Sequence, residues 1–238
     1  MVMAEPLVLL PGMMCDARLF GPQIAELSAE MAVMVAPITQ GERIEEIASG
    51  LLHMLPARFA LAGAGMGGMV AMEILRRAPD RVTRIALLDT SPLADTPGDA
   101  ANREPKIVKV RSGRLAEVMR EEMKSSYFAP GPQCAQVMEL AMDMADALGS
   151  EVYIRQNRAL QRRRDQQGIL RRCRAPALVL CGEHDELFTV KRHSFMAELI
   201  PYAKLVVVEQ AGYMPTLEQP AVTTSALRTW MQQPLVLQ

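Results

Sequence analysis

Residues 63–68, Gly63-Ala64-Gly65-Met66-Gly67-Gly68, join an apolar run to an amphipathic helical pattern. The apolar run Phe59 to Gly63 predicts a buried strand, and Met66 to Arg77 predicts a helix that ends before Pro79. Small residues suit the connection because a backbone that doubles back sharply leaves almost no space for side chains. The stretch therefore predicts a strand, a tight glycine turn and a helix.

Short apolar runs alternate with helical periodicity on both sides of this turn, which is typical of βαβ units on a parallel sheet. The expected strands are residues 7–10, 32–38, 59–63, 85–88, 177–180 and 205–208. The expected helices of this layer are residues 19–27, 44–55, 66–77 and 221–231. We therefore expect an α/β fold with a mainly parallel sheet of about six strands, flanked by helices.

The short apolar runs that predict strands stop after residue 92 and return after residue 172. Only helical periodicity lies between, including runs at 115–123 and 137–148. We expect residues 93–172 to form a helical cap insertion over a core made of residues 1–92 and 173–238. The pair Tyr127-Phe128 and several methionines favour an apolar cap, but the sequence does not indicate which molecule it selects.

The composition limits the possible partners. Half of the 238 residues are hydrophobic, which is enough for one globular domain with a core. The 26 basic and 27 acidic residues give a net charge of −1, so we expect neither a nucleic acid nor an anionic membrane as partner. The apolar run Leu7 to Leu10 is too short for a membrane span and is interpreted as a strand rather than a signal peptide.

Cysteine and glycine patterns give no sign of a metal or cofactor. Cys15, Cys134, Cys173 and Cys181 lack Cys-x-x-Cys spacing, which argues against zinc and against a disulfide framework and favours a reducing cytoplasm. The run at 63–68 matches Gly-x-Gly-x-x-Gly, but it is not on the first strand and no downstream acidic residue supports dinucleotide binding. It also lacks the Lys-Ser/Thr of a P-loop. We expect no cofactor and no metal.

Four segments, in order along the chain, resemble landmarks of the α/β-hydrolase superfamily, specifically of its small esterase-like and haloperoxidase-like members with a helical cap. Residues 10–14 resemble the oxyanion loop, 63–68 the nucleophile elbow, 181–185 the acid loop and 211–215 the histidine loop. The resemblance covers essentially the whole chain. It implies an α/β-hydrolase fold and a pocket for a small molecule bearing an acyl, ester or carboxylate group.

Two catalytic positions of that family are substituted here. The resemblance places Gly65 at the nucleophile, Tyr213 at the histidine and Asp185 at the acid, and it implies that the oxyanion donors are the N–H groups of Met13 and Met66. Glycine has no side chain to attack a substrate, and loss of a serine nucleophile costs on the order of a millionfold in kcat. A phenol, with a pKa of about 10, is a hydrogen-bond donor before it is a base. We expect Tyr213 either to donate to Asp185 or a ligand, or to form a pocket wall.

Other residues give weak substitutes for the missing pair. His184, His53 and His193 are expected to lie away from the pocket or to diverge from it, and Cys15 is expected to be a small buried hydrophobe. Asp89, after the fourth strand, is an alternative carboxylate at the same sheet edge.

Three interpretations of the function therefore remain open. The first is a pseudohydrolase that binds a small ligand without ordinary serine hydrolysis. The second is an ester-type hydrolase or related enzyme that uses water or Tyr213 in place of the lost machinery. The third is an ordinary esterase-like chain altered at both positions. The sequence indicates neither turnover nor oligomeric state.

Overall fold

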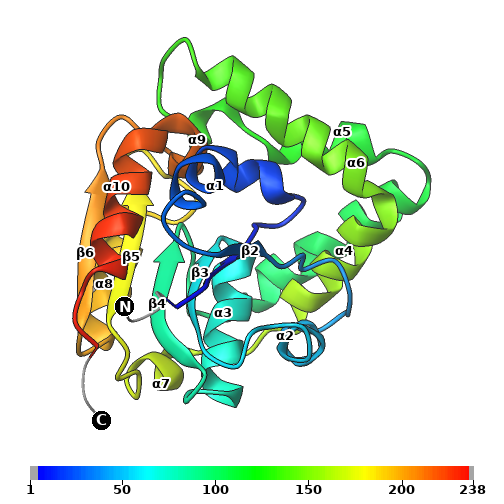
Figure 1. Cartoon of the computed structure of the whole chain (residues 1–238). Coiled ribbons are helices and arrows are strands. Elements are labelled where there is room, and N and C mark those ends of the chain that lie inside the picture. Colours follow the sequence, from blue (N-terminus) through cyan, green and yellow to red (C-terminus); the bar gives the residue numbers. More distant parts are fainter. Residues whose placement is uncertain (1–4, 236–238) are drawn as a thin grey trace.

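The computed structural model describes residues 5–235, in which six parallel strands form one sheet (Figure 1). The strands lie in the order β2-β1-β3-β4-β5-β6. Their bounds are β1 Leu7–Leu10, β2 Val33–Val35, β3 Phe59–Ala64, β4 Val82–Leu88, β5 Ala177–Gly182 and β6 Ala203–Val208. The expected mainly parallel sheet of about six strands is confirmed.

Helices cover both faces of the sheet, which explains why β1, β3, β4 and β5 are buried at every position rather than at alternate positions. One face packs against α2 (Ile44–Leu52), α3 (Met66–Arg77), α7 (Gln167–Leu170) and α8 (Val190–Leu199). The other packs against the 3-10 helix η1 (Ala17–Phe20) and helices α1 (Gly21–Leu27), α9 (Pro215–Glu218) and α10 (Pro220–Met231). The fully buried side chains of Phe20 and Trp230 fill the core on this second face.

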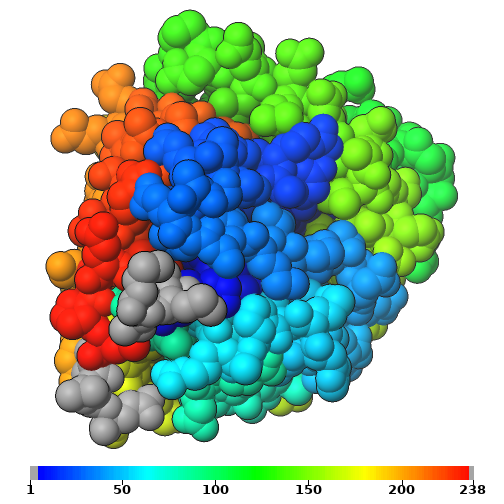
Figure 2. Space-filling view, in the orientation of Figure 1, coloured from blue at the N-terminus to red at the C-terminus, as the bar shows by residue number. Residues whose placement is uncertain are grey.

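The chain between β4 and β5 is helical. It contains α4 (Pro97–Arg111), α5 (Leu115–Glu122), the 3-10 helix η2 (Ser125–Tyr127), α6 (Cys134–Gln161) and α7. Helices α4 to α6, which we call the insertion, build a small core around Ile107, Val118 and Tyr153. Figure 2 shows the blue N-terminal segment between the green insertion and the orange to red C-terminal segment. The division of the chain at residues 92 and 172 stays a prediction.

Several predicted boundaries were wrong for local reasons. The expected helix at 19–27 is η1 followed by α1, because Pro22 in the first turn of α1 begins a new helix. The expected strand at 32–38 shortens to Val33–Val35, since Pro37 has no N–H to donate to a neighbouring strand. The run at 137–148 belongs to the longer α6, whose two helical stretches join at Gly149 with φ of 78°.

Across residues 5–235, none of the helices combines the length and apolar character that crossing a membrane requires.

Candidate functional site

The turn between β3 and α3 is held by close backbone approach. Gly65 has φ of 52° and ψ of −118°, a conformation that favours glycine. A Cβ atom on Gly63 would lie 2.4 Å from the carbonyl oxygen of Gly67, and a Cβ on Gly67 would lie 2.2 Å from that of Leu10. A Cβ on Gly68 would lie 2.7 Å from the Thr90 methyl group. The glycines therefore allow β1, β3 and α3 to meet at one point.

This point is where the strand order reverses direction, between β1 and β3, and such crevices are where open α/β sheets bind ligands. Gly12, in the loop after β1, brings its Cα to 3.7 Å from the position of a Cβ on Gly65. Within residues 5–235, the backbone N–H groups of Met13 and Met66 have no hydrogen-bond acceptor. Helix α3 begins at Met66, so the partial positive charge of its N-terminus lies at this point.

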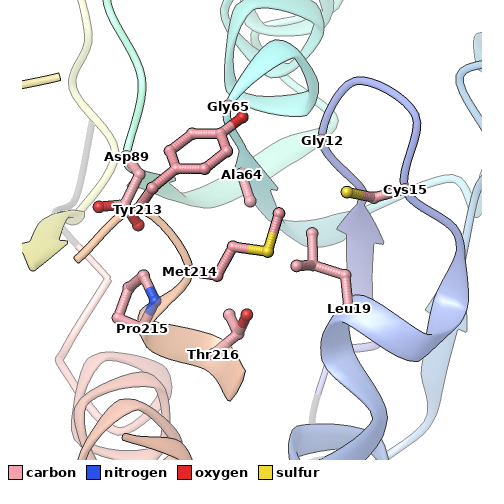
Figure 3. A pocket seen from close by; sticks show the side chains of 10 residues that line it. All are labelled: Gly12, Cys15, Leu19, Ala64, Gly65, Asp89, Tyr213, Met214, Pro215 and Thr216. Carbon is pink, nitrogen blue, oxygen red and sulfur yellow. The ribbon is translucent and has the colours of Figure 1, made fainter. Parts of the chain in front are cut away.

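The Tyr213 side chain reaches across this site to the turn. Its hydroxyl oxygen is 3.2 Å from the position of a Cβ on Gly65, and Figure 3 shows the hydroxyl end of the ring beside Gly65. The remaining cavity has a volume of about 10 Å³, which is about the space of one water molecule. It is lined by Gly12, Cys15, Leu19, Ala64, Gly65, Asp89 and residues 213–216. The phenol thus fills the space above the turn.

The Tyr213 phenol stays neutral at ordinary pH. Burial raises its pKa well above the usual value, and the negative charges that Cys15, Asp185 and Asp89 can carry raise it further. Fewer than about one phenol in a thousand is therefore ionised at neutral pH. Chemically, Tyr213 can donate a hydrogen bond here but is a poor base.

Backbone contacts fix the loop that carries Tyr213. Its N–H donates to the carbonyl of Tyr127, in η2, at 2.7 Å. The buried carboxylate of Glu218 accepts hydrogen bonds from the N–H groups of Ala129, Gly212 and Met214 at 2.7, 2.9 and 2.9 Å. These hydrogen bonds connect the segment after α5 to the loop after β6, and they fix the direction in which the phenol points.

Asp185, in the loop after β5, is buried. Its Oδ1 accepts hydrogen bonds from the N–H groups of Leu187 and Phe188, both at 2.8 Å. Its Oδ2 is buried and has no hydrogen-bond partner in residues 5–235. Burial raises the pKa of Asp185, while the two N–H donors oppose that rise. The Tyr213 hydroxyl, which lies beside Gly65, forms no hydrogen bond to Asp185 within the same residues.

Asp89 and Thr90 contribute more to the site than the sequence indicated. Asp89 lines the cavity, has φ of 42°, and accepts a hydrogen bond from the Gly182 N–H at 3.1 Å. The Thr90 hydroxyl donates to the Gly65 carbonyl at 2.6 Å, and its N–H donates to Nε2 of His193 at 3.2 Å. Burial lowers the pKa of His193 to about 4, so this imidazole is neutral and holds the turn.

The remaining candidates take no part in a nucleophile and base pair. Cys15 lines the cavity, but burial raises the pKa of its thiol to about 12, so the reactive thiolate is scarce. His184 and His53 are exposed. No group of three or more His, Cys, Asp and Glu side chains within residues 5–235 is arranged to hold a metal ion.

Besides Thr90 and His193, two further residues that position the site were missed in the sequence. Glu218 follows Pro215 in the first turn of α9, a place where acidic side chains commonly cap a helix, so a signal existed. Gln156, in α6, accepts a hydrogen bond from the N–H of Met14 at 2.9 Å and donates to the Ile38 carbonyl at 3.2 Å. No local pattern marks Gln156, because its role depends on how the insertion packs on the core.

Comparisons with known proteins agree with the fold. A model of the alpha/beta hydrolase family matches residues 7–226. A pimeloyl-[acyl-carrier protein] methyl ester esterase from Legionella pneumophila is 24% identical over 228 residues, with 89% of each chain covered. The 3-oxoadipate enol-lactonase 2 of Acinetobacter baylyi is 25% identical over 197 residues, covering 80% of this chain and 71% of its own. A thermophilic esterase from Thermogutta terrifontis, solved with malate bound, is similar with a TM-score of 0.89 and 26% identity, covering 97% of this chain and 90% of that one.

Proposed function

The chain belongs to the alpha/beta hydrolase family, and from this premise we propose that it binds a small ester, acyl or carboxylate ligand without serine hydrolysis. The observation that carries the proposal is the Tyr213 hydroxyl, 3.2 Å from the position where a side chain on Gly65 would begin. Residue 65 offers no hydroxyl nucleophile, and residue 213 offers no imidazole. An acyl-enzyme intermediate therefore has no atom on which to form at this turn.

The backbone part of the site supports binding. The free N–H groups of Met13 and Met66 and the N-terminus of α3 favour a carbonyl or carboxylate oxygen, the helix end contributing about 1 kcal/mol. The names of the two curated relatives, a methyl ester esterase and an enol-lactonase, describe acyl compounds. We place Tyr213 among the polar groups that face such a ligand, whereas Asp185 is buried and does not line the cavity.

The cavity of about 10 Å³ has space for a single water molecule. The Tyr213 ring must therefore rotate away from Gly65 before a ligand can enter. The neutral phenol then becomes a hydrogen-bond donor to the ligand oxygen. The apparent affinity falls in proportion to the fraction of protein in the open arrangement.

The alternative, an enzyme that uses water or Tyr213 for catalysis, has less support. General acid and base catalysis works best when the pKa of the catalytic group lies near the working pH. Burial moves the pKa of Tyr213 away from neutrality, and burial moves the pKa of Cys15 to about 12. A rate that rises toward alkaline pH and disappears in Tyr213→Phe would favour this alternative.

Pre-steady-state kinetics with p-nitrophenyl acetate test the loss of hydrolysis. We expect no burst of p-nitrophenol from the natural chain or from Gly65→Ser, which still lacks an imidazole. We expect hydrolysis from the double variant Gly65→Ser/Tyr213→His, because the backbone part of the site is in place. The exposed helical Gly50→Ser is the matched control. A burst from the natural chain would contradict the proposal.

Titration calorimetry with malate tests binding. We expect weak binding by the natural chain and about tenfold tighter binding by Tyr213→Ala, because removing the ring that must move away outweighs the loss of the one hydrogen bond that its phenol donates to the ligand. Tyr202→Ala is the control, because Tyr202 is 49% exposed and lies outside the cavity. Absence of malate binding in both the natural chain and Tyr213→Ala would contradict a carboxylate-binding site.

We also propose a cytoplasmic location. All four cysteines are free thiols, and Cys15, Cys173 and Cys181 are buried in the core. Free thiols persist in reducing compartments. Cell fractionation with an antibody to the chain checks this placement.

A further inference from the structure

We propose that Asp89 and Asp185 form a proton-binding site, in which the carboxylic acid of Asp89 donates a hydrogen bond to the carboxylate of Asp185. The two side chains follow neighbouring strands, β4 and β5, and are only 2% and 4% exposed. Gly182 connects them, because its N–H donates to Oδ1 of Asp89 at 3.1 Å and its carbonyl accepts from the N–H of Asp185 at 3.4 Å.

The unpartnered oxygen of Asp185 requires such a donor. Oδ1 of Asp185 already accepts two backbone hydrogen bonds, whereas Oδ2 is buried with no partner within residues 5–235. A buried carboxylate oxygen without a donor is strongly unfavourable. The Tyr213 hydroxyl does not supply the donor, since it lies at Gly65. The carboxyl of Asp89, in hydrogen-bonding range of Asp185, supplies it when protonated.

Asp89 holds the proton because its surroundings oppose its charge more strongly. Burial raises the pKa of Asp89 well above its usual range, and the neighbouring Asp185 charge raises it further. Burial also raises the pKa of Asp185, but the Leu187 and Phe188 N–H groups stabilise its ionised form. Two carboxyl groups this close share one proton and titrate as a pair.

The groups around the pair provide no positive charge. Glu218 on α9 adds a negative charge, and burial raises the pKa of the Cys181 thiol on β5 to about 12. The Tyr213 phenol is neutral, and His193 on α8, bound to the N–H beside Asp89, has its pKa lowered to about 4 by burial. Among the described residues that face the pair, a bound proton is therefore the source of charge balance.

The sign of the pH effect follows from the raised pKa values. The folded protein keeps a proton that an unfolded aspartate releases near pH 4, so this contribution to stability is complete below about pH 4 and is lost as the pH rises through the folded pKa. The folding constant then falls by up to about tenfold per pH unit. The lowered pKa of His193 acts mainly between about pH 6.5 and 4, and the raised pKa values of the Cys15 and Cys181 thiols act above about pH 8, so a comparison with Asp89→Asn at pH 7 isolates the carboxyl pair.

Infrared spectroscopy and proton counting test the site. At pH 7 we expect a protonated-carboxyl C=O band, shifted in D₂O, in the natural chain and in Asp80→Asn, an exposed control. We expect no such band in Asp89→Asn, whose amide donates to Asp185. In Asp185→Asn we expect the band to disappear at a lower pH than in the natural chain, because the negative charge that raises the pKa of Asp89 further is gone. Unfolding in urea at pH 7 releases about one more proton per molecule from the natural chain than from Asp89→Asn.

Two results would overturn the proposal. One is the absence of the band from the natural chain at pH 7, and the other is its persistence in Asp89→Asn. Should Asp185→Asn fail to fold, the proton count on Asp89→Asn decides alone, because equal proton release from that variant and the natural chain excludes the shared proton.

Discussion

The turn at residues 63–68 and the facing loop at residues 211–215 form the two sides of one site, but different forces hold them. The turn depends on close approach: a Cβ on Gly63 or Gly67 would meet backbone atoms, and a Cβ on Gly68 would meet the side chain of Thr90. The loop is also anchored through its backbone, yet its chemistry depends on the single side chain of Tyr213. A site can therefore change its chemistry at one residue while many shared contacts preserve its geometry.

Among the predicted variants, Gly67→Ala in the turn should destabilise the protein most. Its Cβ would lie 2.2 Å from the Leu10 carbonyl oxygen and 2.4 Å from that of Pro11, and backbone atoms cannot move away cheaply. We expect the free energy of unfolding to fall by about 3 kcal/mol or more, measured by urea denaturation. Gly50→Ala, in the exposed part of α2 with no atom near its Cβ, should instead gain about 0.5–1 kcal/mol. Equal effects at both positions would contradict the packing argument.

In the facing loop, Glu218→Gln should disrupt the hydrogen bonds that anchor the backbone. The carboxylate accepts three buried N–H groups through two oxygens, and glutamine replaces one of those oxygens with a donor. We expect a loss of about 2 kcal/mol in the free energy of unfolding, because at least one buried N–H loses its acceptor. The exposed Glu209→Gln serves as the control and should stay within about 0.5 kcal/mol of the natural chain.

The contact between the two sides gives the smallest and most specific effect. Gly65→Ser places a side chain at positive φ and brings its Cβ to 3.2 Å from the Tyr213 hydroxyl, which should cost about 1–2 kcal/mol. In the background of Tyr213→Phe the hydroxyl is gone, so the same change should cost about 1 kcal/mol less. A double-mutant cycle measured by thermal denaturation gives this coupling. Purely additive costs would mean that the two residues do not interact.

The sequence predicted the ends of helices best where nearby glycine or proline residues set them. The bounds of the helix at 66–77 were correct, because the glycine turn sets its start and Ala78-Pro79 its end. The helix at 137–148 was less than half of α6, since its second half places polar residues such as Gln156 against the core and loses its simple periodicity. The local sequence pattern therefore predicted the elements around the sheet more accurately than the helices of the insertion.

For the site, the sequence placed Gly65 and Tyr213 at the same sheet edge because both follow parallel strands. It did not indicate that the phenol would reach residue 65 itself, nor that Thr90 and His193 would support the turn. These features depend on side-chain direction, which spacing along the chain does not determine. The roles of Asp185, Met13 and Met66 stay predictions.

The nearness of the Tyr213 oxygen to the position of a Cβ on residue 65 also sets the better order for introducing serine at 65 and histidine at 213. A series of variants that first introduces serine at position 65 passes through a strained intermediate with no general base, whereas one that first exchanges Tyr213 for histidine relieves the crowding before the serine is introduced. A mutational library that fixes histidine at 213 before varying residue 65 should therefore recover active clones more often than the reverse order.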